Sequence, residues 1–527
     1  METMPYLSVS SSASLVVLEA GTVRSFPLEG KQVWKIERKN PESESDIELE
    51  SKIVSRKHGR IQSVDGAWYY IEEGSLNGTY YNGEKIKRND KGEFDAVKLT
   101  NGDILRIDSD SLNHPEERGV LFLFTTEGIG NQWKTAMLRK NETSFGRNTE
   151  CDVVIPLPYA SGKHMVILKR SSEYFVMDCD SMAGTWLNGE EIHGEVKLKE
   201  KDMIAICDCT MFLCENKIIY NVPVPKNRNV IPIGEKAEED GIEEREDDLS
   251  THPVVLRANI KSRKVKNNRG FGKKELIRDI KLEIQEGTLV ALIGGAGAGK
   301  STVMNCMNGY ETSGMEGSVE YKGVDLIKNF SRMKYLIGSV QQGDAFHEEI
   351  TVEQELTNAA GIKLPRDTSK AEIAERENKT LKQLGIENVR SNQIAKCSGG
   401  ERRRVNIGIE LVADRQLLCL DEPDAGLDPG NKRKLFETLR NLAHNDGKSI
   451  LTIIHDVSEI DLFDKIIILN KVDNVGRLAF SGTPNEARKY FGAEIKEVYA
   501  IMASDPEKYI FKAMSLTLAK SRNRKHL

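Results

Sequence analysis

The order of apolar and polar positions divides the chain into two halves of different structural type. Residues 1–220 hold short runs of strand type separated by Gly, Asn and Asp, a pattern typical of an all-β sandwich. In the second half, the apolar strand 289–293 is followed by a glycine loop and then by a helical segment at 302–308. That order predicts an α/β domain. No apolar run approaches the roughly 18 residues that a membrane-spanning helix needs.

A change in composition between about residues 222 and 252 separates the two halves. From Glu235 to Asp248 there are nine acidic and two basic residues. A segment of this charge cannot bury enough apolar surface to fold, so it predicts a mobile acidic linker. We therefore expect a first sandwich at 1–125, a second at 126–221, the linker at 222–252, the α/β domain at 253–495 and a helical tail at 496–527.

The N-terminal half repeats itself, which predicts an internal duplication with about 100–110 residues in each copy. The repeated segments are SRKH at 55–58, SLNGT at 75–79 and NG at 82–83, matched by SGKH at 161–164, SMAGT at 181–185 and NG at 188–189. Two sandwiches of the same kind are therefore expected in tandem.

Charge and cysteine content limit the classes of protein to consider. The 75 basic and 81 acidic residues give a net charge of −6, so no nucleic-acid partner is expected. The eight cysteines include no CxxC pair, which indicates free thiols in a reducing cytoplasm. Residues 1–21 lack the positive n-region of a signal peptide.

The glycine loop fits G-x-x-x-x-G-K-[ST] at every fixed position. Its backbone N–H groups are suited to cradle phosphates, Lys300 to reach the β- and γ-phosphates, and Ser301 to ligate Mg²⁺. The expected nucleotide contacts are Gly294, Gly295, Ala296, Gly297, Ala298, Gly299, Lys300, Ser301 and Thr302.

A second phosphate-related segment runs from Cys397 to Asp428. It begins with a Ser-Gly-Gly turn before a helix, where exposed N–H groups favour an anion. It continues as an apolar strand that ends in Asp421 and Glu422. Of two adjacent carboxylates at a strand end, one can lie beside a metal ion while the other acts on a water molecule. Together with the glycine loop, this predicts a site for a nucleotide phosphate.

With these motifs in place, residues from about 254 to 515 resemble the nucleotide-binding domain of an ATP-binding cassette (ABC) protein. The resemblance implies ATP and Mg²⁺ as ligands, Asp421 and Ser301 at the metal, and Glu422 as the base toward the attacking water. It also implies that Gln342 senses the γ-phosphate and the metal, although Gln341 competes for that role, and that His455 contacts the γ-phosphate.

The same resemblance implies a composite site shared by two domains. Ser398, Gly399 and Gly400 would contact ATP held by a partner domain, and Asp428 would lie in the loop between the two. Because the chain has one such domain, a second ABC ATPase domain is expected, from a homodimer or from another partner. Two positions depart from the family pattern. Cys397 stands where Leu or Val is usual, and no aromatic residue that could stack on adenine is evident before Leu276.

Within the family, the segments 397–404, 424–429 and 476–492 are most similar to the G-type subfamily of exporters. In such proteins the tail leads into transmembrane helices, whereas here a basic cluster at 519–527 suits the cytoplasmic edge of a membrane. A merely solvated tail is an equal alternative. The resemblance implies a separate transmembrane permease subunit and a peripheral position at the inner face of the cell membrane.

The two N-terminal sandwiches resemble forkhead-associated (FHA) domains, which bind phosphothreonine peptides. An arginine, a serine hydroxyl and further basic groups can meet the three phosphate oxygens through charge-assisted bonds. The implied contacts are Arg38, Ser55, Arg56 and Asn77 in the first sandwich, and Arg147 and Ser161 in the second. His58 would buttress the binding loop. Ala183 occupies the position of Asn77, which weakens the second site.

The fold expected is thus multidomain, with two all-β FHA-like sandwiches followed by an α/β P-loop NTPase. The leading functional hypothesis is the ATP-hydrolysing subunit of a membrane exporter, regulated by recognition of a phosphothreonine-containing protein. The alternatives are a soluble ABC ATPase, and a phosphothreonine-binding scaffold in which ATP controls dimerisation. The intact Glu422 and His455 favour hydrolysis over the scaffold.

Overall fold

The structure is a computed structural model of the 527-residue chain. It describes residues 13–40, 45–108, 119–127, 132–199, 201–214, 216–222, 252–266, 272–343, 346–504 and 509. They form two compact units, an N-terminal unit made up chiefly of residues 1–224 and a C-terminal unit made up chiefly of residues 225–527. Nearly all of the predicted acidic linker, and most of the predicted helical tail, lie outside the described residues.

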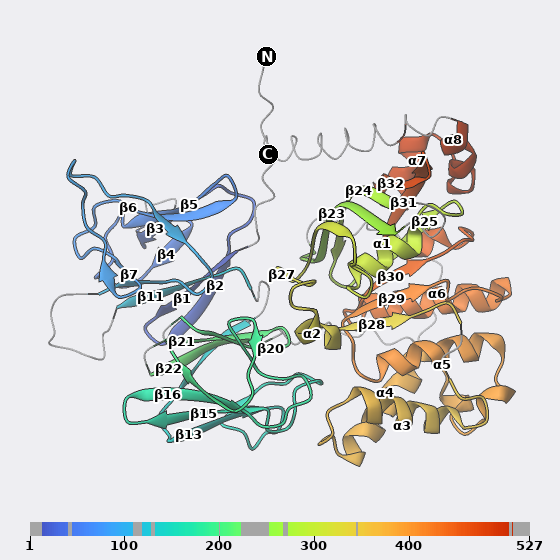
Figure 1. The fold of residues 1–527 in the computed structure, drawn as a ribbon, viewed down its shortest axis with the longest axis horizontal. Helices are drawn as coiled ribbons and strands as arrows, with labels where there is room; N and C mark the ends of the chain where they lie inside the picture. The colour runs from blue at the N-terminus through green and yellow to red at the C-terminus, as the bar shows by residue number, and fades with distance from the viewer. Residues whose placement is uncertain are drawn as a thin grey trace, which may run out of the picture. The chain divides into compact units, whose positions relative to one another are not determined.

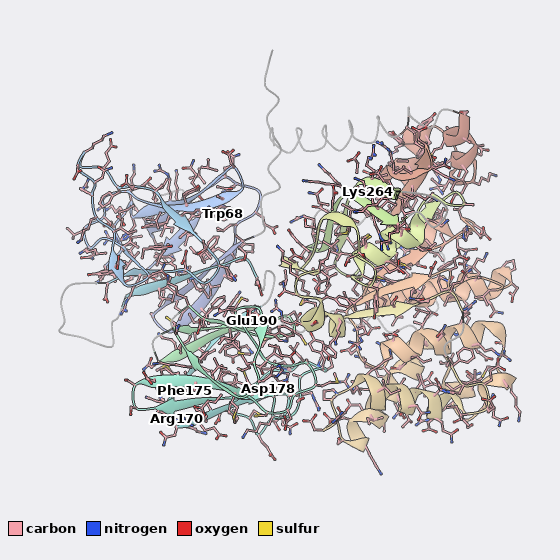
Figure 2. All side chains as sticks on the ribbon, viewed as in Figure 1. Trp68, Arg170, Phe175, Asp178, Glu190 and Lys264 are labelled. Carbon is pink, nitrogen blue, oxygen red and sulfur yellow. The ribbon has the colours of Figure 1, made fainter. Side chains whose placement is uncertain are left out.

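The first part of the N-terminal unit is a sandwich of two sheets, drawn in blue in Figure 1. Its strands are β1 (Ser14–Glu19), β2 (Thr22–Pro27), β3 (Val33–Arg38), β4 (Ile47–Leu49), β5 (Gly59–Val64), β6 (Ala67–Glu72), β7 (Tyr80–Tyr81), β8 (Glu84–Lys85), β9 (Val97–Leu99), β10 (Ile104–Ile107) and β11 (Val120–Thr125). The sheet orders are β2-β1-β11-β10-β7-β8 and β4-β3-β5-β6-β9. Between them lies a core in which Trp68, labelled in Figure 2, packs against Phe124 with ring centroids 6.5 Å apart.

The second sandwich repeats this plan. Its strands are β12 (Gln132–Met137), β13 (Glu142–Gly146), β14 (Val153–Val154), β15 (Met165–Arg170), β16 (Glu173–Asp178), β17 (Trp186–Leu187), β18 (Glu190–Glu191), β19 (Glu195–Leu198), β20 (Met203–Ile206), β21 (Cys209–Cys214) and β22 (Lys217–Val222). The sheets run β12-β22-β21-β20-β17-β18 and β14-β13-β15-β16-β19. The duplication expected from the sequence is therefore visible strand by strand.

One strand breaks the repeat. In the first sandwich, the strand between β2 and β11 is β1, which opens the domain. In the second, the equivalent place between β12 and β21 is taken by β22, which closes it. Among the described residues, β12 is the next strand after β11, which ends at Thr125. The chain supplies the missing strand from the other end of the domain.

The two sandwiches pack on each other through the outer faces of their first-named sheets. Strands β11 and β21 are buried at every position, although a strand with one solvated face would alternate. Val16, Leu121 and Leu123 of the first sandwich share a cluster with Trp133 and Phe212 of the second. The rings of Trp133 and Phe212 are stacked, with centroids 6.3 Å apart. The pair of sandwiches is thus held by an apolar core of its own.

The C-terminal unit is built on a ten-stranded sheet of order β27-β26-β23-β24-β32-β31-β25-β30-β29-β28. The strands are β23 (Val254–Lys266), β24 (Lys273–Gln285), β25 (Leu289–Gly294), β26 (Met315–Tyr321), β27 (Val324–Asp325), β28 (Ile337–Val340), β29 (Leu417–Asp421), β30 (Ser449–Ile453), β31 (Lys465–Val472) and β32 (Val475–Gly482). The helices are α1 (Lys300–Met307), α2 (Phe330–Met333), α3 (Val352–Lys363), α4 (Lys370–Leu384), α5 (Gly399–Leu411), α6 (Pro429–His444), α7 (Pro484–Phe491) and α8 (Val498–Ser504).

The middle of this sheet is parallel, which places its functional ends on one edge. Strand β30 pairs in parallel with both β25 and β29, with Leu292 and Asp421 each opposite Ile453. Every residue of β25 and β30 is buried, as expected for parallel strands covered on both faces. The carboxyl ends of β25, β29 and β30 therefore lie side by side, which is where α/β sheets bind ligands.

Helices α3, α4 and α5 group at one end of the C-terminal unit (Figure 1). Each begins with a reciprocal capping box, set by Thr351, Ser369 and Ser398 respectively, which satisfies N–H groups that a helix start leaves open. A Cβ atom at Gly408 of α5 would lie 3.1 Å from Leu384 and 3.2 Å from Leu356, so glycine allows the three helices to approach closely.

No helix in the described part of the chain combines the length and hydropathy that a membrane span requires.

The packing between the sandwiches can be tested at Trp133, which is 5% exposed. We expect Trp133→Ala to destabilise the N-terminal unit by about 3–5 kcal/mol, because it removes a large buried side chain and leaves a cavity. All four tryptophans, at 34, 68, 133 and 186, lie in this unit, so denaturation followed by tryptophan fluorescence reports on it alone. The matched control is Val64→Ala at a 46% exposed position. Equal unfolding midpoints for the two variants would contradict the prediction.

Candidate functional site

The glycine loop runs from the end of β25 to the first turn of α1, as the sequence predicts. Gly297 and Gly299 have φ values of +72° and +89°, a left-handed conformation that disfavours other residues. A Cβ atom at Gly299 would also lie only 2.6 Å from Ile277. Residues 295–297 are exposed, whereas the strand before them is buried. The loop therefore presents its backbone N–H groups to solvent at a helix start, which is the arrangement that binds an anion.

Lys300 lies at the base of this loop, with 8% of its surface exposed. Its Nζ donates to the Gly294 carbonyl at 2.9 Å. Burial lowers the pKa of Lys300, while the charges of Glu422 and Asp421 oppose that shift. The ammonium group is thus held close to two carboxylates, at the end of the loop where the terminal phosphates of a nucleotide would lie.

Asp421 and Ser301 are hydrogen-bonded to each other. Burial raises the pKa of Asp421, and the Ser301 hydroxyl and the Lys300 charge only partly offset that shift. A half-buried carboxylate with a raised pKa is stabilised in its charged form by a cation. Carboxylate, hydroxyl and amide oxygens are also the ligands that Mg²⁺ takes beside a nucleotide. The residues present therefore fit the predicted Mg²⁺ position.

Glu422 is the point at which distant segments meet. Gln342 Nε2 donates to Glu422 Oε2 at 2.9 Å, and His455 Nε2 lies 2.5 Å from Glu422 Oε1. The partner of Glu422 is thus Gln342 and not Gln341. Glu422 has a φ of +50°, which is unfavourable for a non-glycine residue and occurs most often where function requires a fixed geometry.

Asn406, which was not expected from the sequence, holds the segment that carries Gln342. It lies on α5, and its Nδ2 donates to the Gly343 carbonyl at 2.9 Å. Gly343 follows Gln342 directly, so the bond fixes the segment that carries the glutamine. With Gln342 and Ile409 it also lines a cavity of about 220 Å³. An asparagine inside a helix gives no sequence signal for a contact across 63 residues.

The Ser-Gly-Gly turn forms its hydrogen bonds at the start of α5. Ser398 caps α5, where its hydroxyl and N–H both bond to Glu401. Across the described ranges, no hydrogen bond joins residues 398–400 to residues 294–301. Ser398 and Gly399 are exposed and Gly400 is buried. This half of the predicted phosphate machinery is therefore not assembled around its own loop.

In the first sandwich the predicted phosphopeptide contacts come together from the end of β3 and from two loops. The Arg38 N–H donates to the Ser55 carbonyl at 3.0 Å, and its guanidinium donates to the Lys52 carbonyl at 3.3 Å. The Ser55 hydroxyl accepts from the Leu76 N–H at 2.9 Å. Asn77 Nδ2 donates to the Ile53 carbonyl at 2.7 Å. Arg56 is exposed beside Ser55. Side chains from residues 38, 55 and 77 thus frame one surface.

A buried network lies beneath this loop. His58 Nδ1 accepts from the Ser55 N–H at 3.1 Å, and its Nε2 lies 3.1 Å from the Thr79 hydroxyl. Thr79 donates to Glu72 at 2.6 Å, and the Tyr70 hydroxyl bonds to Thr79 at 2.7 Å. Burial lowers the pKa of His58, with the Glu72 charge opposing. His58 therefore fixes Ser55 without facing the solvent, in agreement with a buttressing position.

The second sandwich keeps the Ser–His hydrogen bond of the binding loop but lacks the side-chain amide that Asn77 provides in the first. His164 Nδ1 accepts from the Ser161 N–H at 3.1 Å, and the Ser161 hydroxyl accepts from the Met182 N–H at 3.2 Å. Arg147 Nε donates to the Ala160 carbonyl at 3.0 Å. Ala183, where the first sandwich has Asn77, is 3% exposed and has no side-chain amide.

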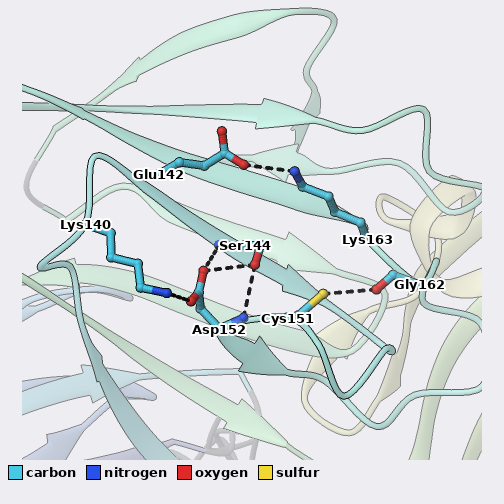
Figure 3. Close-up of polar contacts among 7 residues, drawn as sticks. All are labelled: Lys140, Glu142, Ser144, Cys151, Asp152, Gly162 and Lys163. Atoms are coloured by element: carbon cyan, nitrogen blue, oxygen red, sulfur yellow. Dashed lines mark hydrogen bonds and ion pairs between the residues drawn. The ribbon is translucent and has the colours of Figure 1, made fainter.

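Figure 3 shows the polar groups beside the 161–164 loop of the second sandwich. Lys163 Nζ pairs with Glu142 at 2.8 Å, and Cys151 Sγ donates to the Gly162 carbonyl at 3.1 Å. Lys140 and Ser144 hold the pKa of Asp152 down to about 2. Lys163, the counterpart of Lys57, is therefore engaged by a carboxylate next to the loop.

Comparison with known proteins identifies both kinds of domain. Residues 277–425 match the family model of the ABC transporter, and residues 35–108 and 143–207 match that of the FHA domain. The chain thus carries an ABC-type ATP-binding domain behind two FHA domains, and its fold is two all-β sandwiches followed by an α/β domain.

Two curated relatives illustrate the similarity. The ABC transporter ATP-binding/permease protein Rv1747 of Mycobacterium tuberculosis is 28% identical over 374 residues, which cover 71% of this chain and 39% of that protein. ABC transporter G family member 19 of Arabidopsis thaliana is 34% identical over 232 residues, covering 42% and 31%. The chain therefore spans about two fifths or less of the length of these relatives.

Two solved structures are also similar. A dimeric post-hydrolysis state of the ATP-binding cassette MJ0796 with ADP and Pi has 22% identity and a TM-score of 0.38, and the match covers 44% of this chain and 98% of that one. A structure of the ATP-binding subunit of an ABC transporter has 26% identity and a TM-score of 0.39, with coverage of 47% and 99%.

The His58 network predicts a pH dependence for the N-terminal unit. Because the pKa of His58 is lowered on folding, the unfolded state takes up a proton that the folded state does not. The stability from neutral His58 is present above the ordinary histidine pKa of about 6.5 and is lost as the pH falls below it. Unfolding free energies from pH 7.5 to 5, measured by tryptophan fluorescence, should show a smaller slope in His58→Gln than in wild type. The exposed His193→Gln should keep the wild-type slope, and equal slopes in all three proteins would disprove this assignment.

Proposed function

We propose that this chain is the ATP-hydrolysing subunit of a membrane transporter and that its FHA domains regulate it by binding a phosphothreonine-containing protein. The observation that carries the proposal is the convergence of Gln342 and His455 on Glu422. These three side chains meet at the sheet edge where Lys300, Ser301 and Asp421 also lie. Such a set has no evident structural purpose, since it places charged groups together at a partly exposed edge.

The proposed roles follow from the charge of ATP. The N–H groups of residues 294–302 and the Lys300 ammonium would compensate the triphosphate, so catalysis is largely positioning and electrostatics. Ser301, Gln342 and Asp421 would hold Mg²⁺, which neutralises charge on the phosphates when bound. Glu422 would accept a proton from the attacking water, while Gln342 and His455 orient Glu422 and contact the γ-phosphate.

A second nucleotide-binding domain completes the proposed site. Ser398 and Gly399 are exposed at the start of α5, and in the described part of the chain they form no hydrogen bond with their own glycine loop. Their N–H groups would therefore meet ATP held by another copy. A homodimer is the simplest arrangement that uses both halves of the machinery twice.

The regulatory part of the proposal rests on the first sandwich. Arg38, Ser55 and Asn77 frame one surface, and Arg56 adds an exposed positive charge. Phosphothreonine carries a charge of about −1.5 to −2 and three acceptor oxygens that suit such a surface. In the second sandwich, Arg147 and Ser161 keep a similar frame, but Ala183 gives no anchor for a peptide backbone. We therefore assign the main phosphothreonine site to the first sandwich.

Transport is proposed from the relatives, whose printed names describe ABC transporters. A separate transmembrane permease would supply the membrane spans, and the chain would lie at the inner face of the cell membrane. The alternative of a soluble ATPase, or of a scaffold that uses ATP only to dimerise, predicts that membranes containing the permease leave the ATPase rate unchanged.

The hydrolytic role is tested with Glu422→Gln. The amide keeps the shape of the side chain but cannot accept the proton, so steady-state phosphate release should fall about 10²–10⁴-fold. ATP affinity, measured by calorimetry, should change little. Glu437→Gln, which removes an exposed carboxylate paired with Arg433 on α6, is the control and should hydrolyse ATP normally. A wild type no faster than Glu422→Gln, with and without membranes, would show that the chain is not a motor.

The phosphothreonine site is tested by peptide binding to the full chain. Ser55→Ala removes one hydroxyl bond to phosphate and disturbs the loop, so affinity should fall about tenfold or more. Ser161→Ala, the matched change in the second sandwich, should have little effect. Unphosphorylated peptides provide the baseline. If Ser161→Ala loses binding and Ser55→Ala does not, the phosphothreonine site lies in the second sandwich instead.

A further inference from the structure

The first turn of α6 and its cap contact segments to which the proposed function gives different roles. They are the Ser-Gly-Gly turn, which would face a partner's ATP, and the segments after Glu422 and His455, which would act on the chain's own ATP. Asp428 caps this helix, accepting from the Asn431 N–H at 3.1 Å and from Asn431 Nδ2 at 2.6 Å. Asn431 in turn lies against the Ser-Gly-Gly turn, since a Cβ atom at Gly400 would meet its Oδ1 at 2.8 Å. The helix start is therefore in contact with both segments that are proposed to face a second nucleotide site.

Lys432 connects the same turn to the other side of the chain's own site. Its Nζ lies 2.5 Å from Asp456 Oδ2 and 3.6 Å from Asp424 Oδ2. The Lys432 side chain is 12% exposed and that of Asp424 is 7% exposed, so the contact between these two is largely screened from water, whereas Asp456 is half exposed. Asp456 follows His455 directly, and Asp424 lies two residues after Glu422. One ammonium group thus bridges the segment that carries the histidine and the segment that carries the glutamate.

The Asp456 side chain is held at both oxygens. Its Oδ1 accepts from the Ser458 N–H at 2.9 Å, and its Oδ2 accepts from Lys432. The Lys432 ammonium holds the pKa of Asp456 below its usual value. The loop after β30 therefore has a fixed position relative to α6, and His455 takes its position from that loop.

We propose that Lys432 is a positioning residue that couples the two nucleotide sites of a dimer. In this role, ATP engaged by residues 398–400 and 428 shifts the first turn of α6, and Lys432 carries the shift to His455 at the chain's own nucleotide. The inference rests on the proposed function, because it requires hydrolysis in a dimer. It adds a residue outside the nucleotide motifs and a direction of coupling, from the partner's site to the chain's own site.

The physical basis is a chain of short, directional contacts between elements of secondary structure. Lys432 is largely buried and bonds to Asp456, and the nearby Asp424 carboxylate helps to keep its ammonium group in place. An apolar residue at position 432 could fill the same space but could not hold either carboxylate. The coupling should therefore depend on the positive charge and not on the volume of the side chain.

The test compares Lys432→Met with Lys432→Arg in the full chain, using ATP concentration series of steady-state hydrolysis and calorimetric ATP binding. Wild type should hydrolyse ATP cooperatively. Lys432→Met should reduce kcat about tenfold and bring the Hill coefficient close to one, with ATP affinity unchanged. Lys432→Arg retains the charge and should restore both values. Arg433→Met is the control, because it removes the neighbouring ion pairs to Glu437 and Glu459.

Each outcome either supports the coupling role of Lys432 or overturns it. If wild type hydrolyses ATP without cooperativity, or if Lys432→Met matches Arg433→Met, the coupling is overturned while the proposed function stands. A loss of ATP affinity in Lys432→Met that Lys432→Arg does not reverse points to a purely structural residue and also overturns it. A wild type without ATPase activity overturns the proposed function itself. Should Lys432→Met fail to fold, Asp456→Asn removes the same bridge at a side chain that is 51% exposed, and the same results are expected.

Discussion

The register of three parallel strands is the constraint on which the nucleotide site depends. Strand β30 sets β25 and β29 so that all three end at one edge of the sheet. The glycine loop, Asp421 and the segment leading to His455 leave from those ends. A shift of one strand by a single residue would turn its side chains to the opposite face and displace the residues at its carboxyl end, so the register of the sheet fixes the positions of the catalytic candidates.

How much of this could be predicted depended on whether a residue acts through the backbone or through a distant contact. The glycine loop and Asp421-Glu422 were predicted because their spacing is local, and Gln342 and His455 because of their order along the chain. Asn406 and Lys432 were not, because each lies on a helix face where its residue type is ordinary. Only the fold brings Asn406 to Gly343, or Lys432 to Asp456.

The N-terminal half shows a different limit. The strands and the duplication were expected, but the use of β22 in place of a first strand was not. Its sequence, KIIYNV, indicates a strand without indicating its neighbours. The fully buried strands β11 and β21 likewise carry a signal for a second covered face, yet periodicity alone does not identify what covers it. The cover is the other sandwich.

Comparison of the two sandwiches separates residues that hold a loop from residues that recognise a ligand. The bonds from Ser55 and Ser161 to His58 and His164 are the same, down to equal lengths of 3.1 Å. A Ser-x-x-His motif is therefore explained by loop architecture in either copy and does not by itself indicate binding. The difference lies in Asn77, whose amide donates to the Ile53 carbonyl, and in Ala183, which has no amide, while the Ser–His bonds are the same in both copies. Since a framework can be retained after recognition is lost, phosphothreonine binding in this protein should be judged at positions 77 and 183.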